Sequence, residues 1–118
     1  MLADKAAANL RAGDILAAAG LVDPAASRYY YAMFQAAVHR LTKLGWTPGR
    51  LSSGAVEWNH TMVEHNVLLV RRLRPDRDLF RAMRQLRARA DYFDDSVPPE
   101  EVNSHVDAVR TFVEEACR

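Results

Sequence analysis

The sequence predicts an all-α protein, an up-and-down bundle of about five helices. Apolar residues recur at helical spacing, and no stretch alternates apolar and polar side chains as a half-buried strand does. Apart from Gly13, the glycines and prolines fall between these periodic segments. Short links between such segments are typical of antiparallel helical bundles.

The first predicted helix runs from about Asp4 to Ala19 and ends at Gly20. Its modest apolar stripe consists of Ala3, Ala7 and Leu10. The second predicted helix starts at Asp23, a suitable N-cap, and continues through Pro24 at its first turn. It ends at Leu44, before Gly45. Its predicted core side consists of Tyr30, Met33, Phe34, Ala37, Leu41 and Leu44.

The third predicted helix follows Ser52 or Ser53 and ends at about Leu73, before Pro75. It is apolar over much of its circumference, so we expect it to lie centrally. One side consists of Val56, Val63, Val67 and Val70, and another of Trp58, Met62 and Leu69. His60 lies beside the valines, where a histidine is either a hydrogen-bonded core residue or a catalyst.

A metal or cofactor site is not predicted. Glu57, His60 and Glu64 share a face of the third predicted helix, and Glu57-x2-His60 matches half of a di-iron pattern. The second Glu-x2-His is missing, because Glu101 and His105 are four residues apart. The sequence also has no glycine-rich phosphate loop, nucleophile elbow or His-Glu-x2-His motif.

The fourth predicted helix runs from Asp76 to about Phe93, and the fifth from Pro98–Glu100 nearly to the end. The apolar stripe of the fourth consists of Leu79, Met83, Leu86, Ala90 and Phe93. The stripe of the fifth consists of Val102, Val106, Val109, Val113 and Ala116. Both helices therefore have one side for the core.

The charge is unevenly distributed. The net charge is +1, but residues 71–89 hold eight Arg and two Asp, whereas residues 90–118 hold two Arg and eight Asp or Glu. On the fourth predicted helix, Arg74, Arg77, Arg81 and Arg84 lie opposite the apolar stripe. Because like charges repel, these arginines need water or anions nearby. The candidates are a phosphate backbone, the acidic fifth helix or another chain.

A second polar stripe lies on the second predicted helix, where Arg28, Ala32, Gln35 and His39 follow one another at helical spacing. Such a stripe is either a solvated face or a polar site in a groove or at an interface.

The chain has 118 residues and a mass of 13.3 kDa, which predicts a single domain over residues 1–118. Its longest apolar stretch is too short for a membrane span, and no secretory signal is found. With Cys117 as the only cysteine, no intrachain disulfide can form. We therefore expect a cytoplasmic protein without membrane contact.

Two segments resemble the HEPN family, specifically its small stand-alone prokaryotic branch. Residues 27–37 read Ser-Arg-Tyr-Tyr-Tyr-Ala-Met-Phe-Gln-Ala-Ala, close to the Arg-x-Tyr-Tyr-Ala-Met-Phe-His-Ala-Ala of that branch. Residues 87–92 are similar to its Arg-x-x-Ala-Asp-Tyr element. The family-motif residues are thus Tyr30, Phe34, Arg87, Asp91 and Tyr92, with His60 on the helix between the two segments.

The resemblance implies a helical bundle that is often a homodimer. Active members of the family are metal-independent ribonucleases, several of them toxins paired with a nucleotidyltransferase antitoxin. Their site is an Arg-x4–6-His motif. In it the arginine stabilises charge on the phosphate and the histidine transfers the proton. RNA or a nucleotide, a second copy and such an antitoxin are therefore the expected partners.

The sequence departs from the family at the catalytic histidine. Arg28 is in place, but Gln35 stands where the histidine is expected, and an amide takes up no proton at neutral pH. His39 lies one turn further along the same face, displaced by about 6 Å of helix rise.

Three functions remain open. The first is a binding protein that keeps Arg28 and the arginine-rich helix but has lost the general base. The second is a ribonuclease toxin that uses His39 or His60, and the third is a structural adaptor. We also expect Tyr92 to be partly buried beside the core residues of the fourth predicted helix.

Overall fold

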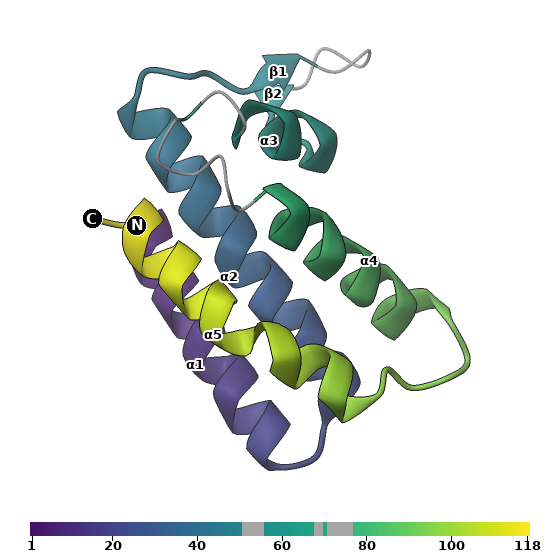
Figure 1. The fold of residues 1–118 in the computed structure, drawn as a ribbon. Helices are drawn as coiled ribbons and strands as arrows, with labels where there is room; N and C mark the ends of the chain where they lie inside the picture. Colours follow the sequence, from purple (N-terminus) through teal and green to yellow (C-terminus); the bar gives the residue numbers. More distant parts are fainter. Residues whose placement is uncertain (51–55, 68–69, 71–76) are drawn as a thin grey trace.

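The computed structural model describes residues 1–50, 56–67, 70 and 77–118. Within them the elements are α1 (Leu2–Ala18), α2 (Val22–Lys43), β1 (Gly49–Arg50), β2 (Val56–Glu57), α3 (His60–Val67), α4 (Arg77–Tyr92) and α5 (Pro99–Ala116). Figure 1 shows α1, α2, α4 and α5 running alternately in opposite directions, with α3 and the strands at one end. The predicted all-α bundle is confirmed.

The centre of the bundle is α2, which packs against each of the other four helices (Figure 1). The prediction that the third helix lies centrally is wrong. Five alanines of α2 are fully buried, and their small side chains let neighbouring helices approach closely: Ala25, Ala26, Ala32, Ala36 and Ala37. Larger fully buried side chains fill the rest of the core, among them Tyr30, Phe80, Met83 and Phe112.

A close approach between α1 and α2 explains the glycine inside α1. A Cβ atom at Gly13 would lie 2.7 Å from a ring carbon of Tyr29, so only glycine admits this ring without a shift. The hydroxyl of Tyr29 donates to Asp14 over 2.7 Å, and Arg110 of α5 donates to both oxygens of the same carboxylate. Burial alone would raise the pKa of Asp14, but these two partners hold it below its usual value.

Two predicted helix starts are wrong, because other residues stand at the N-caps. The N-cap of α2 is Leu21, while Asp23 accepts a hydrogen bond from the backbone N–H of Val97 and so ties the α4–α5 link to α2. The N-cap of α3 is Asn59, whose side chain accepts from the N–H of Met62 over 2.7 Å. The predicted caps at residues 52 and 53 lie outside the described residues.

Val56 and Glu57, just before Asn59, lie in a strand rather than in a helix. Arg50 pairs with Val56 in a two-stranded antiparallel sheet, and Glu57 lies in β2. The predicted helix face shared by Glu57, His60 and Glu64 is therefore wrong. Residues 68–69 and 71–73, the end of that predicted helix, fall outside the described residues.

Three smaller predictions about the core are also wrong. Leu44 and Phe93 are 53% and 67% exposed, because each lies just beyond the end of its helix. Ala7 is exposed, and the buried residues of α1 are Ala6, Leu10 and Gly13. No helix among the described residues is long and apolar enough to span a bilayer.

Candidate nucleic-acid interface on the open face of α2

The polar stripe of α2 is tied to α1 by one asparagine. Arg28 is exposed and donates to Oδ1 of Asn9 over 3.1 Å. Nδ2 of the same Asn9 donates to Oε1 of the half-buried Gln35 over 2.8 Å. Ala32, between Arg28 and Gln35, is fully buried. The stripe is thus neither wholly solvated nor wholly buried. Its residues Arg28 and Gln35 are held in place by Asn9 of α1.

His39 lies apart from Arg28 in this arrangement. Eleven residues of helix separate the two, which is about 16 Å of rise. Burial, with help from Lys43 and Arg40, lowers the pKa of His39, so its ring is neutral at pH 7. Within one chain the two side chains are too far apart to act on one phosphate group.

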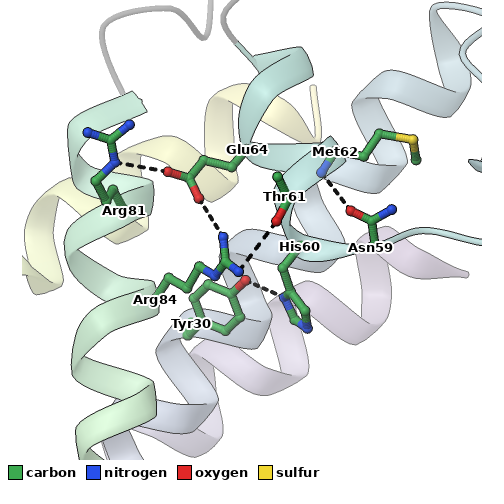
Figure 2. Close-up of polar contacts among 8 residues, drawn as sticks. All are labelled: Tyr30, Asn59, His60, Thr61, Met62, Glu64, Arg81 and Arg84. Carbon is green, nitrogen blue, oxygen red and sulfur yellow. Dashed lines mark hydrogen bonds and ion pairs between the residues drawn. The ribbon is translucent and has the colours of Figure 1, made fainter.

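His60 is hydrogen-bonded to Tyr30, and Figure 2 shows this pair between α2 and α3. Burial raises the pKa of the Tyr30 hydroxyl, so the phenol keeps its proton. Burial, and then the nearby Arg87 and Arg84, lower the pKa of His60. A protonated phenol beside a neutral imidazole favours donation from Tyr30 to Nδ1, which leaves the ring proton on Nε2. In this tautomer His60 is a donor rather than a base.

Two arginines of α4 converge on one carboxylate of α3. Arg81 and Arg84 donate to the two oxygens of Glu64 over 3.2 and 3.0 Å, and Arg84 also reaches the hydroxyl of Thr61 (Figure 2). The Glu64 side chain is only 12% exposed. These arginines therefore meet an acid of α3 rather than of α5. A cavity of about 210 Å³ borders them, lined also by His65.

The other predicted arginines differ in their surroundings. Arg74 lies outside the described residues, as does the side chain of Arg77. Arg89 pairs with Glu101 of α5. Arg89 is not one of the four predicted arginines, but among the described arginines of α4 it is the one that forms an ion pair with the acidic fifth helix.

The two segments of the resemblance meet where α4 packs on α2. Ser27 donates to one oxygen of Asp91 over 2.7 Å, and Nε of Arg87 lies 2.9 Å from the other. The guanidinium of Arg87 also lies over the rings of Tyr31 and Tyr92, at 5.4 and 5.7 Å from their centroids. Tyr92 is 72% exposed, so the prediction that it is partly buried is wrong.

An aromatic groove of about 300 Å³ shares Tyr31 with the Arg87 contact and Gln35 with the polar stripe. Its lining comes from α1, α2 and the link before α3: Leu2, Tyr31, Phe34, Gln35, Val38 and Trp58. Phe34 packs against His60 with the ring centroids 4.7 Å apart and the ring planes tilted by 42°, which fixes this wall of the groove. We call the exposed surface from Arg28 through this groove to Arg87 the open face of α2.

Sequence reasoning missed two residues of this face, Asn9 and Trp58. Asn9 stands out in the sequence as a single amide in an alanine-rich helix. The neighbouring residues of α1, however, do not indicate that it faces Gln35. Trp58 was assigned to a helix side that does not exist. Within the described part of the chain, no group of three or more His, Cys, Asp and Glu side chains is placed to hold a metal ion.

Comparison with known proteins gives one match. A family model described as the HEPN domain matches residues 1–118, the whole chain. No curated protein and no solved structure matches the sequence.

Proposed function

Because the chain belongs to the HEPN domain family, we propose that it is an RNA-binding member that has lost the general base of the family. In this proposal it acts in the cytoplasm as a homodimer, as one domain over residues 1–118. It serves a prokaryotic toxin–antitoxin or defence system, with a nucleotidyltransferase-type antitoxin as its expected partner.

One observation carries the proposal. Arg28 is exposed and, among the described residues, hydrogen-bonds only to the uncharged Asn9, so its positive charge is available to a phosphate. Gln35, which takes the place of the histidine, is hydrogen-bonded on the same surface. The open face therefore offers a cation and aromatic rings, the combination that binds single-stranded nucleic acid.

The ribonuclease alternative has weaker support. General acid–base help is worth about 10²–10⁴ in rate, and Gln35 supplies none of it. His39 is remote from Arg28 along α2, and the favoured tautomer of His60 has no free lone pair on its outer nitrogen. Neither histidine is arranged as the partner of Arg28.

A binding titration tests the proposal. We expect a short fluorescent single-stranded RNA to bind the wild type in anisotropy measurements, and Arg28→Ala to weaken binding about tenfold, since hydrogen bonds to charged groups contribute about 1.5–3 kcal/mol. Affinity should fall steeply between about 50 and about 200 mM salt. The matched control is Arg11→Ala, an exposed arginine of α1 that borders the α5 side. Unchanged RNA binding by Arg28→Ala would contradict the role of Arg28, and indifference of every partner to this variant would favour the structural adaptor.

A cleavage assay without metal ions tests the loss of the base. Wild type, Gln35→His and Arg28→Ala are incubated with RNA in a chelator. We expect the wild type to be inert and Gln35→His to cut RNA. If the wild type cuts and Arg28→Ala does not, the protein is a ribonuclease and the binding proposal is wrong.

The homodimer is tested by sedimentation. A strict monomer at micromolar concentration would contradict this part of the proposal, and RNA binding would then have to occur on a single chain.

A further inference from the structure

The amide of Gln35 has a fixed direction, because an arginine orients it. A guanidinium has five N–H donors and no acceptor, so only the oxygen of Asn9 can face Arg28. The amide nitrogen of Asn9 must then face Gln35, and the oxygen of Gln35 must face Asn9. The chain Arg28–Asn9–Gln35 thus leaves the NH2 group of Gln35 without a partner among the described residues.

Gln35 lines the aromatic groove, so its NH2 group is a hydrogen-bond donor available there beside the hydroxyl of Tyr31 and the indole N–H of Trp58. The remaining lining is apolar or aromatic, including Tyr31, Phe34 and Trp58. A volume of about 300 Å³ is at the lower end of ligand pockets and suits one planar ring. Arg28, joined to Gln35 through Asn9, adds a positive charge at the edge. Aromatic faces, a hydrogen-bond donor and a nearby cation together match a nucleotide.

The donor character of Gln35 discriminates between bases. Uracil and guanine present carbonyl oxygens where cytosine and adenine present amino groups. A glutamine that pairs with adenine uses its oxygen as well as its nitrogen. Here one lone pair of the Gln35 oxygen is already occupied by Asn9. In this orientation the NH2 group of Gln35 can donate to a carbonyl oxygen of a base. An amino group of a base at the same place would be a second donor and could not accept this hydrogen bond.

We infer that the aromatic groove binds one base of a single-stranded RNA and selects a carbonyl-bearing base, uracil or guanine, over cytosine and adenine. This inference rests on the proposed RNA-binding function and adds to it the class of base. Gln35 is the contacting residue, and Asn9 and Arg28 are positioning residues for it.

The test compares oligo(U), oligo(C) and oligo(A) of equal length in the same anisotropy titration. We expect the wild type to bind oligo(U) at least about tenfold more tightly than oligo(C), because one good base-edge contact gives about 1–3 kcal/mol of discrimination. Gln35→Glu removes the donors, so the ratio of the two affinities should fall to one or below, whatever the added charge does to binding overall.

Asn9→Asp is the decisive variant. A carboxylate at this position accepts from Arg28 and also from the NH2 group of Gln35, so the glutamine turns and presents its oxygen to the groove. The preference should reverse toward oligo(C) and oligo(A). Asn9→Leu, which only removes the connection, should flatten the preference without reversing it.

A second pair of variants tests the stacking surface. Trp58→Ala should weaken binding of all three RNAs about fivefold or more. Trp46→Ala, which removes a part-buried tryptophan outside the groove lining, is the matched control and should leave binding unchanged. Circular dichroism confirms that each variant is folded.

The failures of the two proposals are distinguishable. If Arg28→Ala weakens all three RNAs but the wild type binds them equally, the base inference is wrong and the RNA-binding function stands. If Trp58→Ala turns a dimer into a monomer and leaves RNA binding unchanged, a second copy covers the groove and the inference is wrong. If no RNA binds, both proposals fail.

Discussion

Tyr29 and Tyr30 are neighbours in sequence and both are buried, yet they contact different neighbours of α2. Tyr29 lies against Gly13 and donates to Asp14, in the closed contact between α1, α2 and α5. Tyr30 bonds His60 beneath the open face. The difference shows that one side of α2 is committed to packing, while the other holds rings and charges near the surface.

The sharpest test of the closed side is Gly13→Ala. The added methyl group would meet the ring of Tyr29, and overpacking of this kind costs about 1–3 kcal/mol of unfolding free energy. Urea denaturation measures the loss. In a Tyr29→Leu background Gly13→Ala should cost less than it costs in the wild type, because the smaller side chain makes room. An equal cost of Gly13→Ala in the two backgrounds would show that the close contact is not the cause.

At the contact between α3 and α4, Glu64→Gln should separate stability from binding. Removing the negative charge leaves Arg81 and Arg84 without their anionic partner, so we expect a loss of about 1–2 kcal/mol in urea denaturation. The released arginines should raise the affinity for RNA. The control is Glu101→Gln, which breaks the exposed pair with Arg89 and should cost at most about 1 kcal/mol. RNA affinity below that of the wild type would contradict this prediction.

Removal of each phenol hydroxyl tests the comparison directly. Tyr29→Phe and Tyr30→Phe should each cost about 1 kcal/mol, the typical worth of one hydrogen bond. Only Tyr30→Phe should alter RNA binding, because it frees the ring of His60 beside Phe34. If Tyr29→Phe changes RNA binding equally, the division of α2 into two sides is wrong.

The smallest expected effect is a pH dependence of stability. Because the pKa of His60 in the folded protein lies below its usual 6.5, the unfolded chain binds more protons, and stability should decline as the pH falls below about 6.5. His39 adds to the same slope. Asp14, whose pKa lies below 3.8, adds a further loss only at more acid pH. Thermal unfolding is measured from pH 8 to pH 3. His60→Gln should reduce the dependence of the melting temperature on pH near pH 6.5 alone, and Asp14→Asn should reduce it at acid pH alone.

The sequence predicted those elements whose signals are local. Pro24 and Gly45 mark the ends of α2 correctly to within two residues, and prolines mark the start of α5. The third helix was misplaced because Val56 shares the helical spacing of Val63 and Val67, although it pairs in a strand. The central place of α2 was missed because its burial rests on alanines, which a search for large apolar side chains overlooks.

The candidate site was predicted in part for the same reason. The polar stripe with Arg28 and Gln35 follows from helical spacing alone. Its connection through Asn9 depends on how α1 packs against α2, which no local pattern encodes. Tyr92 was misjudged because it is the last residue of α4, where its ring lies on the outside beside Arg87.

The hydrogen-bonded series Arg28–Asn9–Gln35 has a consequence for the pH dependence of the proposed base contact. A guanidinium stays charged at every physiological pH, and amides do not titrate. The direction of the Gln35 amide is therefore the same in an acidified cell as in a neutral one. A histidine at this position would change its hydrogen-bonding character near pH 6.5. Compared with the histidine of the family motif, the amide of Gln35 is thus a hydrogen-bonding group whose character does not change with pH in this range.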